Sequence, residues 1–390
     1  MYNYIPLEQA ADILDSYRKP VNSKERLNLN KGKPLDELFP YYGATGQVGW
    51  IDSFLTDGEY ILLGEDGAPF LNPYAEKAYI IHGKTWVNNH AHILRSKTNN
   101  EFLCYYLNYF NYKKYVSGTT RLKLTQAQMR KIPIPNIPSD EQSRIVARIE
   151  ELFSKLDKAV DTLKTTKEQL EVYRQAVLKD AFQEKENIIR LGDAIEKPRY
   201  GTSKKCDYPC TANSTAVLRI PNIDTKNGRV DSSDLKYAEF NEKELEQLSL
   251  KNGDILIIRS NGSISLVGSS AIIRKCDTDK TYAGYLMRLR ILNKEKLLPK
   301  YLLYYLSSPD ARRYIESVAK STSWVNNINS QEISKLCVPL SSIEKQEKTV
   351  AEIEMKLSVY HEIEKSVDTV LVQADAMRQS ILKQAFEGAL

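Results

Sequence analysis

The residues of this sequence that could do chemistry alone form only fragments of catalytic and metal-binding patterns. Gly83-Lys84-Thr85 matches the end of a phosphate-binding loop, but that loop needs a glycine where the chain has Ala78. Asn72-Pro73-Tyr74 matches part of an amino-methyltransferase signature and lacks its second proline. Two pairs of metal-ligating residues have no further ligand at a zinc-site spacing: Cys206 with Cys210, and His90 with His92. We therefore predict no catalytic residues, no metal site and no cofactor bound by this chain.

Other polar residues are suited to hydrogen bonding with the edges of nucleic-acid bases. Arginine pairs well with guanine, asparagine and glutamine with adenine, and serine and threonine with either. One such cluster alone is equally typical of a solvated loop, but here the clusters recur in both halves of the chain. The predicted DNA-binding residues are Tyr42, Thr45, Lys84, Asn88, Asn89, His90, Thr119, Thr120, Arg121, Lys123, Arg219, Asn222, Arg259, Ser260, Asn261, Thr322, Ser323, Trp324 and Asn326.

The clusters recur because the chain contains an internal repeat. Leu124–Pro135 aligns with Ile328–Pro339 at a shift of 204 residues, and the same shift continues without a gap through the following segment. Upstream the shift is smaller: Gly58–Leu63 aligns with Gly253–Ile258 at 195 residues. Each half of the chain is therefore a diverged segment followed by a better-preserved one.

The preserved segments are predicted to be long helices. Prolines hold the approach to the first segment extended, and Ser139 with Gln142 predicts a capping box at the helix start. Apolar residues then follow at spacings of three and four, which predicts a heptad seam and antiparallel pairing of the two helices. The alternative is two independent amphipathic helices, each packed on its own domain. The predicted seam and subunit-interface residues are Gln142, Ile145, Ile149, Leu152, Leu156, Leu163, Tyr173, Gln346, Ile353, Tyr360, Ile363, Val367, Val370, Met377 and Ile381.

The diverged segments are predicted to be mixed sheet domains. Short apolar runs, such as Tyr60–Leu63 and Ile255–Ile258, predict buried strands. Phe102–Tyr115 and Pro299–Val318 are predicted to be helices, and the glycines of Tyr41–Trp50 predict a turn-rich loop.

The predicted fold class is α+β, with an internal pseudo-two-fold repeat. Two mixed α/β domains, residues 1–138 and 187–340, are separated by a pair of long antiparallel coiled-coil helices, residues 139–186 and 341–390.

Charge is distributed unevenly between these parts. The 390 residues carry 55 basic and 50 acidic side chains, a net charge of +5. Residues 141–186 hold 9 basic and 10 acidic side chains, and residues 344–390 hold 6 and 9. The remaining residues hold 40 and 31, so the positive excess lies in the diverged domains, as is typical of domains that bind a polyanion. The absence of a long apolar run argues against a membrane span, and five scattered cysteines favour the reducing cytoplasm.

These features together resemble the specificity (S) subunit of type I restriction–modification systems. The resemblance rests on Ile132–Gln142 with the heptads that follow, on Leu250–Leu256 and on Tyr42–Gly46, and it covers essentially the whole chain. The second copy departs from the pattern, because Lys345 stands where the first copy has an acid, Glu141. The two helix starts are therefore expected to offer unequal interfaces.

The resemblance implies a non-catalytic recognition subunit in which each domain binds one half of a bipartite target in double-stranded DNA. The helices would set the spacing of the halves and dock two methyltransferase (modification) subunits, through which restriction (translocase–nuclease) subunits join. S-adenosylmethionine, ATP and magnesium are expected in those partner subunits. The main alternative is a non-catalytic protein–protein scaffold with peptide-binding sheet domains, and salt-sensitive binding to duplex DNA distinguishes the two.

Overall fold

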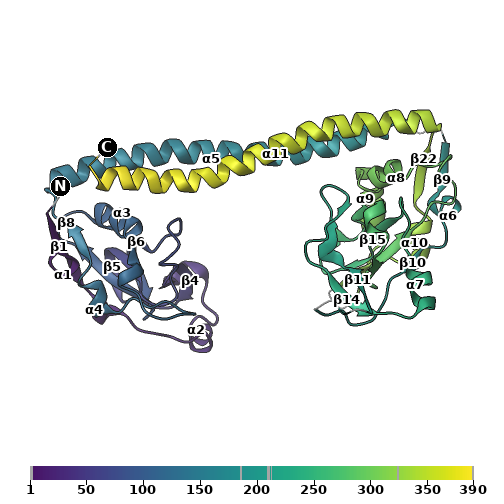
Figure 1. Ribbon diagram of the computed structural model, residues 1–390. Coiled ribbons are helices and arrows are strands. Elements are labelled where there is room, and N and C mark those ends of the chain that lie inside the picture. Colours follow the sequence, from purple (N-terminus) through teal and green to yellow (C-terminus); the bar gives the residue numbers. More distant parts are fainter. Residues whose placement is uncertain (1–2, 185–186, 209–210, 212, 323–324, 389–390) are drawn as a thin grey trace. The chain divides into compact units, whose positions relative to one another are not determined.

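The computed structural model describes residues 3–184, 187–208, 211, 213–322 and 325–388. The chain divides into two compact units: Met1–Thr165 together with Val367–Leu390, and Thr166–Ser366. Each unit contains one sheet domain and a part of both long helices (Figure 1). The first unit therefore joins the beginning of the chain to its end.

The first unit is built on a six-stranded sheet in the order β2-β7-β5-β6-β3-β4, antiparallel except for the β3–β6 pair. Its strands are β2 (Ala11–Ile13), β3 (Phe39–Gly43), β4 (Gly46–Ile51), β5 (Thr56–Gly64), β6 (Ala78–Val87) and β7 (Ala91–Ser96). Its short helices are α1 (Leu7–Ala10), η1 (Asp15–Tyr17), α2 (Ser23–Leu29), η2 (Leu35–Glu37), α3 (Asn100–Tyr109), η3 (Tyr112–Lys114) and α4 (Gln126–Met129).

The central strand β5 explains how this sheet holds two cores. Side chains of a strand alternate between its faces, so Ile61 and Leu63 join the cluster that includes α3, whereas Tyr60 and Leu62 join a second cluster on the other side. The turn-rich loop predicted over Tyr41–Trp50 is wrong. This segment is the β3–β4 hairpin, in which the glycines permit the tight turn.

The second unit repeats this plan with shorter strands, most of which lie in three sheets. The largest has the order β10-β19-β15-β17-β13-β12, with β10 (Arg199–Tyr200), β12 (Ile223–Asp224), β13 (Arg229–Val230), β15 (Ile255–Ile258), β17 (Ser270–Ile272) and β19 (Leu286–Leu289). The others are β14-β11-β18 and β16-β21-β20, with β11 (Ser214–Leu218), β14 (Lys236–Glu239), β16 (Ser260–Asn261), β18 (Thr281–Tyr282), β20 (Lys320–Thr322) and β21 (Val325–Asn327). The helical segments are α6 (Leu191–Ala194), η4 (Ile220–Asn222), α7 (Glu242–Leu248), η5 (Ile264–Leu266), η6 (Lys275–Asp277), α8 (Pro299–Leu306), α9 (Pro309–Val318) and α10 (Ser330–Ser334).

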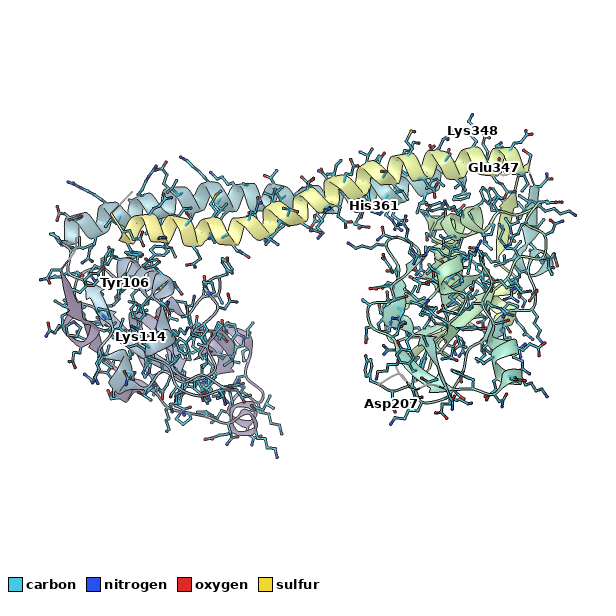
Figure 2. All side chains as sticks on the ribbon, in the orientation of Figure 1. Tyr106, Lys114, Asp207, Glu347, Lys348 and His361 are labelled. Carbon is cyan, nitrogen blue, oxygen red and sulfur yellow. The ribbon has the colours of Figure 1, made fainter. Side chains whose placement is uncertain are left out.

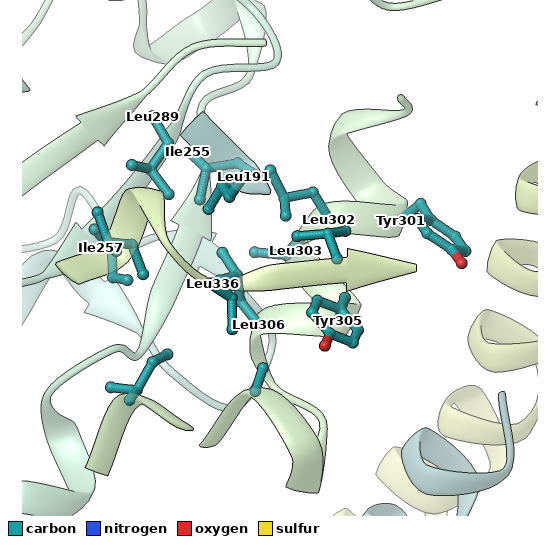
Figure 3. Packing of buried hydrophobic residues seen from close by; sticks show 14 of the residues in the cluster. Leu191, Ile255, Ile257, Leu289, Tyr301, Leu302, Leu303, Tyr305, Leu306 and Leu336 are labelled. Carbon is teal, nitrogen blue, oxygen red and sulfur yellow. The ribbon is translucent and has the colours of Figure 1, made fainter. Parts of the chain in front are cut away.

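The core of the second unit forms where α8 packs on β15. Leu302 and Leu306 of α8 are fully buried and lie in one cluster with Ile255 and Ile257 (Figure 3). The single helix predicted over Pro299–Val318 is wrong, because the hydroxyl of Ser308 accepts a hydrogen bond from the backbone N–H of Ala311 and starts a separate helix, α9. In the first unit, similarly, α3 ends at Tyr109 instead of continuing to Tyr115.

A short antiparallel pair of strands closes each domain. In the first domain, β1 (Tyr4–Pro6) pairs with β8 (Pro133–Pro135). In the second, β9 (Asn187–Arg190) pairs with β22 (Cys337–Leu340). The chain therefore enters and leaves each domain at neighbouring strands.

The two long helices are α5 (Ser139–Ala181) and α11 (Ile343–Phe386). They pair antiparallel, as predicted: in the second unit the pairs Glu171–Tyr360, Asp180–Lys356 and Glu184–Lys345 run in opposite directions along the two helices. The predicted capping box is wrong, because Ser139 is already helical. The amide of Gln142 instead donates to the carbonyl of Ile137 at 2.8 Å.

The predicted heptad seam is correct at every second position and displaced by one residue at the others. Ile149, Ile353, Tyr360, Val367 and Ile381 are buried. The alternate positions that we expected to be buried are 41% to 54% exposed: Tyr173, Ile363, Val370 and Met377. The seam passes through the next residue in each case, and those residues are Arg174, Glu364, Leu371 and Arg378. Three of the four are charged. A register predicted from the spacing of apolar residues alone therefore could not include them.

Candidate functional site

Three of the predicted clusters in the first domain meet at one open cavity of about 670 Å³. Thr45 comes from the β3–β4 turn, Asn88 and His90 from the link between β6 and β7, and Thr120 and Arg121 from the segment that precedes α4. These side chains lie far apart in the sequence and share a wall only because β3 and β6 are neighbours in the sheet. The cavity offers hydroxyl, amide and guanidinium groups of the kind that bind base edges.

The segment before α4 is held by the loop after β5. The backbone N–H of Leu124 donates to the carbonyl of Glu65 at 2.7 Å, and that of Gly67 donates to the carbonyl of Leu122 at 3.0 Å. Side chains reinforce this pairing at two further contacts: Arg121 Nε lies 2.6 Å from Asp66 Oδ1, and Lys123 Nζ lies 3.3 Å from Glu65 Oε1. The predicted Arg121 and Lys123 are therefore positioned by two acids that the sequence prediction missed.

The two histidines of β7 and its approach have different roles. His90 lines the cavity, with Nδ1 3.6 Å from Asp66 Oδ2. His92 is fully buried, with Nδ1 2.8 Å from Asp15 Oδ2 and Nε2 3.0 Å from the Leu124 carbonyl oxygen. Through these two contacts His92 fastens the segment before α4 to the sheet.

Two carboxyl groups around His92 are held in the ionised form. Burial raises the pKa of Asp15, but hydrogen bonds from His92 and Gln126 and the charge of Arg18 outweigh it, and the pKa lies below its ordinary 3.8. Burial likewise raises the pKa of Glu65, and the contacts with Arg18, His92 and Lys123 bring it below 4.5. The segment before α4 thus rests on a charged network inside the domain.

The other predicted residues of the first domain lie outside this cavity. Asn89 lines a neighbouring cavity of about 630 Å³. Tyr42 packs its ring 5.9 Å from that of Tyr79, and Lys84 lies 4.9 Å above the ring of Phe54. Thr119 is exposed on the segment before α4.

The second domain has a cavity of about 680 Å³ lined by three predicted residues, Arg219, Arg259 and Ser260. The guanidinium of Arg259 stacks on the ring of Tyr200 with its carbon 4.4 Å from the ring centroid, and one of its Nη1 hydrogens is donated to the carbonyl of Gly284. Arg219 is paired with Asp234 at 2.9 Å. Aromatic and basic residues of this wall that the sequence prediction missed include Tyr200, Lys204, Lys236 and Tyr285.

The remaining predicted residues of the second domain differ in whether their side chains are free to contact a base. Asn222 is 1% exposed and its side-chain amide already binds the backbone of Arg219, Asp231 and Asp234, so the structure argues against a base contact by this residue. Asn261 and Asn326 face each other as partners in the β16–β21 pair. Thr322 ends β20, and Ser323 and Trp324 lie outside the described residues.

The two cavities occupy related places in the repeat. The shift of 195 residues that aligns β5 with β15 also carries Gly64–Gly67 onto Arg259–Gly262. In both domains the loop after the central strand pairs with a segment that comes much later in the chain. That segment precedes α4 in the first domain and α10 in the second. This alignment was the signal that could have identified Glu65 and Asp66 from the sequence.

The predicted interface residues at the helix starts are buried within their own units. Gln142 accepts a hydrogen bond from the Thr98 hydroxyl at 2.9 Å, and Gln346 accepts one from the backbone N–H of Leu298 at 2.9 Å. These matched glutamines tie each helix to the domain that precedes it. Their assignment to a subunit interface stays a prediction, as it does for Ile145, Leu152, Leu156 and Leu163, which are partly buried.

An apolar stripe remains on the outer face of the helices. In the second unit, Met355, Val359 and Ile363 follow one another at spacings of four residues on α11 and are 65%, 53% and 41% exposed. Residues so spaced lie on one face of a helix. This stripe on α11 is free to bury apolar area against another protein.

Two features are absent from the described ranges of the chain. Among those residues, no three histidine, cysteine or acidic side chains gather closely enough to hold a metal ion. No helix of the described chain combines the length and the apolar character needed to cross a membrane.

Comparison with known proteins gives consistent matches. The sequence model of the family described as "Type I restriction modification DNA specificity domain" matches residues 8–172. The chain is 29% identical over 316 residues to a Haemophilus influenzae protein named as a candidate type I restriction enzyme specificity subunit, S.HindORF215P, with 77% of this chain and 74% of the relative aligned. It is 28% identical over 289 residues to the type I restriction enzyme EcoKI specificity subunit of Escherichia coli (strain K12). That alignment covers 70% of this chain and 61% of the relative.

The fold also matches a solved structure. A chain from a study of complex assembly and conformational transition in the type I R-M system superposes with a TM-score of 0.71 at 17% identity, covering 100% of this chain and 98% of that one. At this identity the match concerns the fold alone.

Proposed function

Because the chain belongs to the family of type I restriction–modification specificity subunits, we propose that it is the DNA-sequence-reading subunit of such a system. Each domain reads one half of a bipartite target in double-stranded DNA, and α5 and α11 set the spacing between the halves. The proposed domains are residues 1–138 and 187–340, with residues 139–186 and 341–390 as the spacer helices. The chain itself has no catalytic role.

The observation that carries this proposal is the repeated cavity. In each domain, loops that are distant in sequence bring guanidinium, amide and hydroxyl groups to one open surface after the central strand. Lysine and arginine side chains around it supply contacts to phosphates, which set affinity, while the groups inside it select bases. The net positive charge of the two domains supports this assignment.

The proposed partners follow from the same family. Two methyltransferase subunits dock on the helices, where Met355, Val359 and Ile363 offer an exposed apolar stripe. Restriction subunits join through them, and S-adenosylmethionine, ATP and magnesium act in those partners. We place the complex in the cytoplasm, the reducing compartment that the scattered cysteines favour.

Methylome sequencing of a host that carries this chain with its modification subunit tests the proposal. A bipartite methylated sequence is expected, and the assembled complex should bind a duplex of that sequence with an affinity that falls steeply as salt rises. A complex that binds peptides but shows no salt-sensitive affinity for duplex DNA would establish the scaffold alternative instead.

A further inference from the structure

Arg121 is held at one nitrogen and open at the others. Its Nε lies 2.6 Å from Asp66 Oδ1, and the side chain is 60% exposed beside the cavity of the first domain. The guanidinium lies against Gly67, where a Cβ would stand 3.3 Å from Nε, so a side chain at this position would push the guanidinium away by a few tenths of an ångström. No hydrogen bond from its two Nη groups is found among the described residues.

Asp66 is itself fixed from both sides. The preceding residue, Glu65, donates its backbone N–H to the carbonyl of His90 at 2.7 Å, and Asp66 is bridged to the backbone of Lys123. Its side chain is only 24% exposed. The carboxylate therefore stays in place while the guanidinium it holds faces the cavity.

A guanidinium fixed at Nε presents its two Nη groups as a planar fork. Guanine offers O6 and N7 as two adjacent acceptors in the major groove, whereas adenine offers one acceptor and one donor. Fixing the fork beforehand lowers the ordering cost of the pair and favours the base with two acceptors. An arginine without such support would bind phosphates and bases with less discrimination.

We propose that Arg121 determines specificity for a guanine in the half-site read by the first domain, and that Asp66 is its positioning residue. The inference rests on the proposed DNA-reading function and adds to it the base and the two residues that select it. Thr120, Asn88 and His90 complete the wall around the bound base edge.

The second domain has an amide in place of the acid that holds Arg121. The shift of 195 residues places Asn261 at the position of Asp66. Asn261 pairs through its backbone with Asn326, which donates from its amide to the carbonyl of Gly262 at 2.9 Å. The half-site read by the second domain therefore serves as an internal control.

The experiment selects a randomised pool of duplexes for binding to the full chain assembled with its methyltransferase subunit. The variants are Arg121→Ala, Arg121→Lys and Asp66→Asn, with Asp52→Asn as the control, because Asp52 pairs with Lys33 at 2.8 Å away from the cavity. The readout is the base preference at every position of both half-sites. Hydrogen exchange of β5 and β7 reports whether each variant is folded.

Wild type should require guanine at one position of the first half-site. Both Arg121 variants should lower that preference about 10- to 100-fold, the contribution of a bidentate pair, and leave the other positions and the second half-site unchanged. Asp66→Asn should lower it about 2- to 5-fold, as expected for the loss of a partly exposed ion pair. Asp52→Asn should change nothing.

The outcomes separate this inference from the function on which it rests. If Arg121→Lys, which keeps the charge and loses the fork, retains the guanine preference, the inference is overturned. It is also overturned if the Arg121 variants weaken all sequences equally, which marks a phosphate contact, or if Asp66→Asn keeps full discrimination. If wild type selects no sequence in either half, the proposed function itself fails.

Discussion

Two phenylalanines occupy matched positions of the repeat, one at the end of each long helix. We predict that the stability of the first domain depends on the end of α11 and that the stability of the second domain depends on the end of α5. Phe182 and Phe386 are related by the shift of 204 residues; Phe182 directly follows α5, and Phe386 is the last residue of α11. Phe386 is 3% exposed and packs on the first domain, where its ring centroid lies 5.4 Å, 5.2 Å and 5.5 Å from those of Phe102, Tyr106 and Tyr109. Tyr106 lies on the side of that domain that faces the helices (Figure 2).

Phe182 makes the corresponding contacts in the second unit. It is 2% exposed, with its ring centroid 5.1 Å and 5.2 Å from those of Tyr301 and Tyr305. Replacing a buried phenylalanine by alanine costs about 3–5 kcal/mol. A unit of ordinary stability has about 5–15 kcal/mol, so either substitution removes a large part of it.

The assay is hydrogen exchange of the full chain, resolved by peptide. Phe386→Ala should speed the slowest exchange of β5, β7 and α3 by roughly a hundredfold to several thousandfold and leave β15, β19 and α8 unchanged. Phe182→Ala should do the reverse, so each variant is the control for the other. The reasoning is refuted if Phe386→Ala loosens the second unit, or if both variants loosen the same unit.

Three further predictions concern the network, the spacer helices and the domains. Because folding lowers the pKa of Asp15 and Glu65, their stabilising contribution is full above about pH 5 and is lost as the pH falls through the lowered values. The protection of Ser117–Leu124 should fall with it, and Asp15→Asn should weaken that pH dependence and leave the part that belongs to Glu65. Inserting one heptad into both α5 and α11 should lengthen the gap in the methylated sequence, whereas an unchanged gap would show that the helices do not set the spacing. Replacing residues 187–340 by the corresponding domain of a relative should alter one half of the methylated sequence, and a change in both halves would contradict independent reading.

The repeat and the polar clusters made much of the fold accessible from sequence. The central strands β5 and β15 were predictable because their apolar runs are continuous, and the helices because their heptads extend over many turns. The register of the seam was not, since Arg174, Glu364 and Arg378 occupy it. Glu364 is 9% exposed and is satisfied by Lys226 at 2.6 Å and by the hydroxyl of Tyr360, partners that no pattern of spacing reveals.

The candidate site was predictable in its composition and not in its assembly. The clusters around Asn88 and Arg121 were identified from residue type, but their meeting depends on the parallel pairing of β3 with β6, which the sequence does not specify. Asp66 was missed because an acid near a predicted DNA surface has the wrong charge for a phosphate contact. Asp66 instead holds the guanidinium of Arg121, a contact that only the structure shows. Asn222 was predicted to bind DNA because its amide has the right chemistry for a base contact. In the structure that amide is fully used in hydrogen bonds within the domain.

The contacts of Phe386 also determine when the core of the first domain can be completed during translation. The first domain has left the ribosome once residue 138 is well clear, but the helix end that completes its core is made roughly 250 residues later, about 10–50 s at bacterial elongation rates. The aromatic surface around Phe102 and Tyr106, in the domain that is translated first, therefore stays uncovered until Phe386 has been made.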